Sequence, residues 1–220
     1  IGSMADLDAA SLADVHRWFS DNYGPNNVVL ALAGDIDTAT ARPMVERWFG
    51  HIPRGKAVVQ VEAGPVTLPA PVEQVVTDAV PVTAIYRSWT GPGLNHPDAV
   101  PLQVGMHILG GLQSSRLDNA LVRGSGQAVA VNGLAEMNEQ LSYLMAIVYV
   151  SEGVERSEAQ AALEAEIARL LAEGPDAAEL ERAKVQIIAG TIGAMESVGG
   201  FGGKGMILAE GLLYRGDAGA

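Results

Sequence analysis

The sequence predicts an α+β protein with a mixed or antiparallel sheet and helices packed on one face of that sheet. Two β-rich runs, 127–137 and 140–150, are joined tightly at Asn138-Glu139, which favours an antiparallel hairpin. Two long helical patterns then follow each other, at 154–173 and 176–198. Strands and helices that are grouped rather than strictly alternating are typical of α+β proteins.

The first fifty residues predict a helix, a strand and a second helix. Ser11 and Asp14 form a capping-box pattern, and apolar side chains recur at helical spacing over 11–21. After a Gly-Pro-Asn-Asn turn, Val28–Ala33 is a continuous apolar run ending in Gly34-Asp35, which predicts a buried strand. Residues 40–49 predict the second helix, which ends at Gly50.

Residues 52–71 differ in character, because proline and glycine recur there around a short valine-rich piece. Such a segment is typical of a linker between two structural units. Strands are expected next, at about 73–78 and 82–89.

The second unit combines this sheet with several helices. Residues 97–109 predict a helix that Gly110-Gly111 terminates, and Ser114–Arg123 predicts a shorter one. Leu141–Val150 is apolar on both alternating faces, so we expect it to be the central strand. Asp176 and Glu179 form another capping-box pattern, and a glycine-rich break at 199–203 precedes a last helix, 204–214.

Composition excludes several classes of function. The chain has 220 residues with 14 basic and 26 acidic side chains, a net charge of −12, which disfavours binding to nucleic acid. No apolar run approaches the roughly 20 residues that a membrane-spanning helix needs. There is no cysteine, so the chain has neither disulfides nor a thiolate metal site.

The residues alone reveal no catalytic constellation. None of the four histidines has a second ligand at metal-binding spacing, and no Gly-x-Ser-x-Gly elbow occurs. The glycine-rich segment 199–205 follows a helix and lacks the Ser or Thr of a phosphate-binding loop, which favours a hinge between helices. The histidines are His16, His51, His96 and His107.

Several short motifs follow one another along most of the chain. In the first part these are Tyr23-Gly24-Pro25-Asn26-Asn27-Val28, Ala33-Gly34-Asp35-Ile36-Asp37 and Trp48-Phe49-Gly50-His51-Ile52-Pro53. In the second part they are Ile108-Leu109-Gly110-Gly111, Ser114-Ser115-Arg116-Leu117, Leu121-Val122-Arg123, Glu179-Leu180-Glu181-Arg182-Ala183-Lys184 and Gly200-Phe201-Gly202-Gly203-Lys204. In their order and spacing they resemble the motifs of the insulinase/pitrilysin family of zinc peptidases, bacterial branch.

The resemblance implies a processing-peptidase-like fold and a domain organisation. Residues 1–51 would be the helix–strand–helix end of a preceding catalytic-type domain, 52–71 a linker, and 72–220 a second, inactive-type domain that stops before its C-terminal elements. The family's inverted zinc motif, His-x-x-Glu-His with a distal glutamate, would lie before Ile1. It follows that zinc belongs to the parent protein, and that this chain supplies no metal ligand, no catalytic residue and no cofactor site.

The same resemblance implies that the second domain walls a chamber and binds a peptide or small-protein substrate as an extended strand. Some family members use an arginine and a nearby tyrosine to hold substrate. Arg123 matches the arginine, but the tyrosine position falls on Val129 or Ala130 and is empty. Arg123 is therefore the single candidate substrate-binding residue, and its alternative role is that of an ordinary cation at a helix C-terminus.

Three functions stay open at this point. The chain is part of a zinc metalloendopeptidase, a non-catalytic partner or assembly subunit of the same fold, or an unrelated small-molecule-binding domain. Expected partners are a peptide substrate and a catalytic domain of the same protein or a homologous subunit, with homo-oligomers possible; neither nucleic acid nor a membrane span is expected. Whether the compartment is periplasmic or cytoplasmic is left open.

Val28–Ala33 poses a separate question, because a strand this apolar is unfavourable on its own. The family resemblance puts its sheet partners before Ile1. We therefore expect it either to fill a vacant strand position in the second domain or to pair with a neighbouring molecule.

Overall fold

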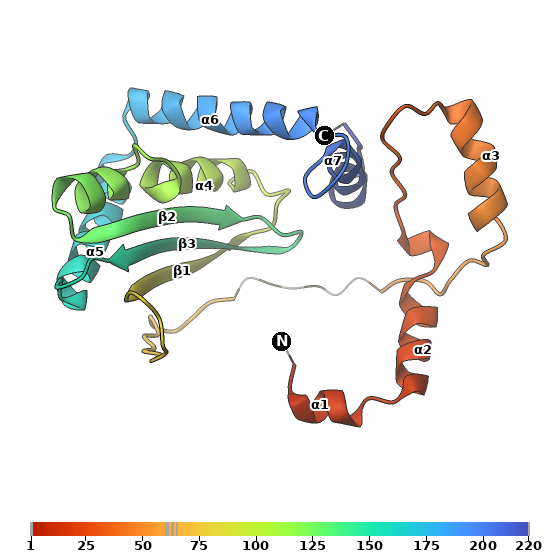
Figure 1. Ribbon diagram of the computed structural model, residues 1–220, viewed down its shortest axis with the longest axis horizontal. Coiled ribbons are helices and arrows are strands. Elements are labelled where there is room, and N and C mark those ends of the chain that lie inside the picture. Colours follow the sequence, from red (N-terminus) through yellow and green to blue (C-terminus); the bar gives the residue numbers. More distant parts are fainter. Residues whose placement is uncertain (1, 60–61, 63, 65, 220) are drawn as a thin grey trace. The chain divides into compact units, whose positions relative to one another are not determined.

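The structure is a computed structural model that describes residues 2–59, 62, 64 and 66–219 (Figure 1). The chain divides into two compact units. Unit 1 comprises Ile1–Val61 and Gly193–Ala220, and unit 2 comprises Glu62–Ile192. These units are defined by contacts within the chain, whereas the linker predicted at residues 52–71 would divide two functional domains and stays a prediction.

Unit 1 is made of helices and extended segments. Ser11 and Asp14 close a reciprocal capping box at the start of α2, as predicted, and the Asp37 carboxylate accepts the Thr40 N–H at the start of α3. No residue of the three N-terminal α-helices is buried. Its helices are α1 (Met4–Ala9), α2 (Leu12–Asn22), η1 (Pro25–Asn27), α3 (Thr38–Phe49), α7 (Lys204–Glu210) and η4 (Gly211–Arg215).

Val28–Ala33 does not form the strand that its composition predicts. Val28 has extended backbone angles, φ −133° and ψ 135°, but the segment joins no sheet among the residues that the structure describes. A strand needs a neighbouring backbone to satisfy its N–H and C=O groups, and unit 1 provides none within the described ranges.

Unit 2 contains a three-stranded antiparallel sheet in the order β1-β3-β2. The strands are β1 (Ala84–Pro92), β2 (Ala128–Glu136) and β3 (Leu141–Val150), so the prediction of a central strand at Leu141–Val150 is confirmed. The strand expected at 73–78 is wrong: these residues lie outside the sheet. Their valines favour a strand locally, but no backbone pairs with them.

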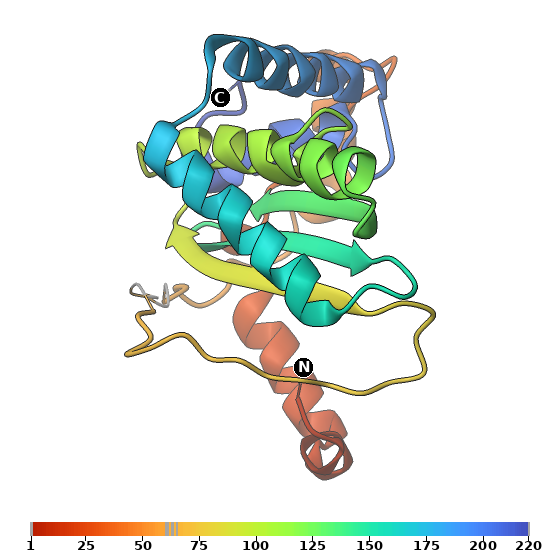
Figure 2. The same ribbon diagram turned by 90° about the vertical axis from the view of Figure 1, so that its left-hand side faces the viewer.

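Helices cover one face of this sheet, as the sequence predicts. Figure 2 shows α5 (Arg156–Glu173) crossing the strands, with α4 (Ala99–Met106) on the same side and α6 (Ala177–Glu196) beyond α4. Two short π-helical segments, η2 (His107–Gly111) and η3 (Asp118–Gly124), complete this layer. The core between sheet and helices is formed mainly by Leu109, Leu117, Leu121, Leu144, Ala146, Val148, Val150, Ala159 and Leu163.

The opposite face of the sheet carries the alternate residues, because successive side chains of a strand point to opposite sides. Tyrosines dominate this face: Tyr86 and Tyr143 are exposed and Tyr149 is partly buried. The Tyr143 hydroxyl donates a hydrogen bond of 2.6 Å to Glu136, its cross-strand neighbour. We call the residues Tyr86, Ser88, Thr90, Tyr143, Met145, Ile147 and Tyr149 the open face.

Gly110 does more than terminate a helix, which was its predicted role. It lies against Gly133 of β2, and a Cβ on Gly110 would come within 2.8 Å of the Gly133 nitrogen. A Cβ on Gly133 would lie 2.5 Å from the Met106 carbonyl oxygen and 2.8 Å from the Gly110 Cα. The two glycines therefore allow the helical layer to approach the backbone of β2 directly.

Gly133→Ala should destabilise the protein by about 1–3 kcal/mol, because the new methyl group meets backbone that cannot rotate away. Gly105→Ala in α4 is the control, since a Cβ there meets nothing within 4 Å. We expect that change to be neutral or stabilising by up to about 1 kcal/mol. Urea unfolding measures both, and equal stabilities of the two variants would contradict the close contact.

No helix within the described ranges is long and apolar enough to cross a membrane.

Candidate functional site

Arg123, the predicted substrate-binding residue, lies in the last turn of η3. Its Nε is 2.7 Å from the Asp118 carboxylate, and its Nη2 donates to the carbonyl oxygen of Gln113. Its side chain is nevertheless 57% exposed. Two acceptors thus hold the guanidinium in place while part of it faces solvent, and five N–H donors leave some for a ligand.

A shallow groove of about 650 Å³ lies beside Arg123. The segment 112–114 forms one side and α6 the other, so the whole groove belongs to unit 2. Its surface is mainly apolar, with a second arginine, Arg182, and Glu181 at its border. The residues that line it are Leu112, Gln113, Ser114, Arg123, Glu181, Arg182, Val185, Gln186 and Ala189.

The position expected for a tyrosine lies at an irregularity in β2. The register with β3 shifts between Ala128 and Ala130, and both Val129 and Ala130 are exposed. Ala130 pairs directly with Tyr149 of β3. The phenol of Tyr149 on β3 therefore lies directly opposite Ala130, one of the two positions at which the motif would carry a tyrosine.

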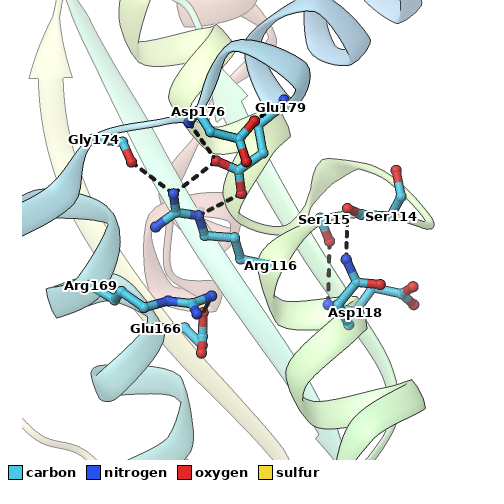
Figure 3. A network of polar contacts seen from close by, with 10 residues as sticks. Ser114, Ser115, Arg116, Asp118, Glu166, Arg169, Gly174, Asp176 and Glu179 are labelled. Carbon is cyan, nitrogen blue, oxygen red and sulfur yellow. Dashed lines mark hydrogen bonds and ion pairs between the residues drawn. The ribbon is translucent and has the colours of Figure 1, made fainter.

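Arg116 and Glu179 connect two of the motifs in the second unit (Figure 3). Arg116 donates from Nε and Nη2 to the two carboxylate oxygens of Glu179, each at 2.8 Å. Its Nη2 also donates to the Gly174 carbonyl oxygen at 2.7 Å. Glu179 in turn accepts the backbone N–H of Asp176 at 2.9 Å, which completes the predicted capping box of α6. The pair thus ties the Ser-Ser-Arg-Leu segment to the start of α6.

In this ion pair Arg116 is buried and Glu179 is largely shielded from solvent. The Arg116 side chain is 7% exposed, and its Nη1 has no hydrogen-bond partner among the described atoms. The hydrogen bonds from Arg116, supported by the Asp176 N–H, hold the pKa of Glu179 at about 2, against an ordinary value of 4.5. The two side chains are therefore structural, and neither is free to act on a substrate.

Acid should destabilise the protein through Glu179. Its pKa is lower in the folded state than in the unfolded one, so the unfolded state binds more protons below about pH 5. The stabilisation is complete above this range and is lost as the pH falls toward 2, in total about 3 kcal/mol. Urea unfolding from pH 7 to pH 2 measures it.

Glu179→Gln should flatten that acid dependence, whereas Glu181→Gln should not. Glu181 lies on the same helix, but its carboxylate is exposed and pairs with the exposed Lys184 at 2.9 Å. An unchanged acid limb in the Glu179 variant would contradict the assignment.

Sequence reasoning missed the Arg116–Glu179 pair, although both residues lie in quoted motifs. Ser115 was missed as well: its buried hydroxyl accepts the Asp118 N–H at 3.3 Å and begins the turn that carries Arg123. A buried arginine requires an acceptor, so the arginine directly before the core residue Leu117 was the available signal.

The histidines do not assemble into a metal site. Among the described residues, no group of three or more His, Asp or Glu side chains is placed to hold a metal ion. His96 accepts the Asp98 N–H at Nδ1, 3.1 Å away, and so acts within a turn. The side chains that the structure describes therefore offer no ligand set for a catalytic zinc ion.

A comparison with protein-family models decides the family. The model described as the peptidase M16 inactive domain matches residues 9–187. The chain belongs to this family. The resemblance to insulinase-type zinc peptidases is thereby confirmed, and so is the α+β fold. The match also supports a non-catalytic role for this part of the protein. A search of curated proteins finds no significant match.

Solved structures share the fold of this M16 inactive-domain chain. A protease from Helicobacter pylori aligns with a TM-score of 0.78 and 21% identity over 97% of this chain and 52% of its own. A peptidase M16 inactive domain from Pseudomonas fluorescens gives 0.69 and 23% over 88% and 48%. A chain of complex III from Candida albicans gives 0.74 and 17% over 98% and 52%. This chain thus spans about half the length of these structures.

Proposed function

We propose that this chain is the substrate-holding, non-catalytic part of a zinc metalloendopeptidase. In this proposal residues 1–51 end a catalytic-type domain, 52–71 link it to the second domain, and 72–220 form that inactive-type domain. The zinc ion and its bound water belong to the catalytic-type domain or to a homologous subunit.

The observation that carries the proposal is the exposed guanidinium of Arg123 above an apolar groove. Asp118 and the Gln113 carbonyl fix its orientation, so binding a ligand costs little additional side-chain entropy. A peptide carbonyl or C-terminal carboxylate accepts the remaining donors, while Leu112, Val185 and Ala189 contact an apolar side chain. The ligand class is a peptide rather than a small anion.

The open face of the sheet supports the second half of the proposal, the wall of a chamber. Its tyrosines offer apolar ring surface together with hydroxyl groups, a combination that contacts peptides without demanding one sequence. Glu136 accepts the Tyr143 hydroxyl, so that end of the wall carries a hydrogen-bonded carboxylate whose negative charge the neutral phenol does not cancel.

Peptide binding to the purified chain tests the role of Arg123. Fluorescence anisotropy with a labelled, unstructured peptide should give an affinity that Arg123→Ala weakens by about tenfold, the usual effect of losing hydrogen bonds to a charged group. Arg47→Ala is the control, because Arg47 lies over Trp48 on α3 of unit 1. Equal affinities of the unaltered chain and the Arg123 variant would overturn the assignment.

We expect the chain alone to bind no stoichiometric zinc and to hydrolyse no peptide. In the parent enzyme, Arg123→Ala should raise KM with little change in kcat, as expected for a residue that only holds substrate. Proteolysis by the purified chain that a chelator abolishes would contradict this division of roles.

The second candidate function is that of a partner or assembly subunit without proteolysis. The similarity to a chain of complex III favours it, since that structure is a multisubunit assembly by its name. The gene sequence before Ile1 distinguishes the two: a His-x-x-Glu-His motif there supports the peptidase, and its absence supports the subunit.

A further inference from the structure

The charges around the Arg123 groove leave one cation unmatched. The Arg123 guanidinium is balanced by the Asp118 carboxylate at 2.7 Å, and the Glu181 carboxylate by the Lys184 ammonium at 2.9 Å. Arg182, which lines the groove from α6, makes no ion pair or hydrogen bond with another described residue. These five side chains together carry one positive charge, in a chain whose net charge is −12.

The carboxylate of unit 2 that Arg182 influences is already occupied. Arg116 is the main cause of the lowered pKa of Glu179, and the charge of Arg182 makes only a smaller contribution. Both carboxylate oxygens of Glu179 accept hydrogen bonds from Arg116. The exposed Arg182 guanidinium is thus available to a ligand, and an anionic group on that ligand would form strong, charge-assisted hydrogen bonds with it.

The two arginines lie on opposite sides of the groove. Arg123 belongs to the side formed by residues 112–114, because it donates to a carbonyl oxygen of that segment, and Arg182 belongs to the α6 side. The buried Arg116–Glu179 pair fixes these two sides to each other (Figure 3). The groove therefore has its shape before a ligand binds, with a guanidinium group on each side, and binding costs less ordering of the protein.

The α6 side of the groove changes from charged to apolar along the helix. The α6 residues that follow Arg182 in the groove are three, four and seven positions further on, so all of them share one face of the helix. They are Val185, Gln186 and Ala189. Seven residues of helix rise about 10 Å, the length of about three residues of an extended peptide. A ligand with a negative charge at one end and an apolar side chain beside it matches this order.

We propose that the groove binds the free C-terminus of an extended peptide that ends in an apolar residue. The terminal carboxylate binds between Arg123 and Arg182, and the last side chain packs on Val185 and Ala189. A carboxylate offers two charged oxygens to two guanidinium groups, whereas an internal peptide carbonyl offers one neutral oxygen and leaves the charge of Arg182 unmatched. This inference rests on the proposed function, in which Arg123 holds a peptide, and adds which part of the peptide is held.

Two peptides test the proposal by fluorescence anisotropy on the full chain. They share one unstructured sequence that ends in leucine and carries the label at its N-terminus, and they differ only in a C-terminal carboxylate or amide. At low ionic strength the free acid should bind about tenfold more tightly than the amide, the usual effect of a charged hydrogen-bonding group. Equal affinities would overturn this inference and leave the peptide site itself in place. If neither peptide binds, the inference and the proposed function both fail.

Arg182→Gln and Arg156→Gln form a matched pair of variants. Each removes one exposed cation from unit 2, but only Arg182 lines the groove. Arg182→Gln should lower the preference for the acid from about tenfold to below about threefold and leave the affinity for the amide nearly unchanged. Arg156→Gln should keep the full preference. An undiminished preference in the Arg182 variant would contradict the assignment of the carboxylate to that residue.

Free-acid peptides that end in leucine or in serine test the place of the last side chain. Contact of the leucine side chain with the apolar part of the groove should strengthen binding by at least about fivefold. Val185→Ser should reduce that difference, whereas Ile188→Ser should not, because Ile188 is equally exposed on α6 but does not line the groove. Equal binding of the leucine and serine peptides to the unaltered chain would contradict an apolar site for the last residue.

Discussion

Arg116→Ala should destabilise unit 2 by about 3–5 kcal/mol, more than any other single charge deletion in this chain. The change leaves the Glu179 carboxylate buried without its cation, and a broken buried pair costs far more than a broken exposed one. It also removes the donor to the Gly174 carbonyl. Urea unfolding followed by circular dichroism gives the difference.

Lys184→Ala is the control for that measurement. Lys184 lies on α6 and pairs with Glu181 at 2.9 Å, and both side chains are exposed. A pair of this kind contributes at most about 1 kcal/mol. If the Arg116 and Lys184 variants lose the same stability, the Arg116–Glu179 pair is not the connection between the motifs that the geometry indicates. Arg116→Ala with Glu179→Leu should recover part of the loss, because no unpaired charge remains.

Ile147→Ala should cost about 2–5 kcal/mol, the usual price of truncating a buried aliphatic side chain. Ile147 is at the middle of the central strand, between Tyr86 on β1 and Asn132 on β2, and is only 7% exposed although it belongs to the open face. Its neighbours on that face therefore cover it, and their contacts would be lost with it.

Val129→Ala provides the comparison, since Val129 lies at the irregular start of β2 and is exposed. We expect a change below about 0.5 kcal/mol there. If Ile147→Ala also lowers the free energy of unfolding by less than about 0.5 kcal/mol, the open face has no packed centre. The proposal of a rigid chamber wall would then be contradicted.

Local signals explain which parts of this fold were predictable from sequence. The capping boxes at Ser11 and Asp176 depend on residues three positions apart, and both are present. Leu141–Val150 was identified as central because its residues are apolar on both faces. Val28–Ala33 and residues 73–78 have equally strong strand composition but form no ladder, because pairing depends on a backbone remote in sequence.

The candidate site shows the same limit at the level of single residues. Family motifs pointed to Arg123, but not to the acceptors that orient it, Asp118 and the Gln113 carbonyl. Gly110 was expected to stop a helix on local grounds, whereas its close neighbour is Gly133, which arrives from β2. In both cases the decisive partner is set by packing, which a single sequence does not display.

The Arg116–Glu179 pair also bears on the speed of unfolding. The two residues are 63 positions apart, and α5 and both strands of the β2–β3 hairpin lie between them in the chain. Contacts that close so long a loop tend to form after the folding transition state. Loss of the Arg116–Glu179 pair should then leave the refolding rate nearly unchanged and accelerate unfolding. The pair therefore slows the unfolding of the native state and does not belong to the folding nucleus.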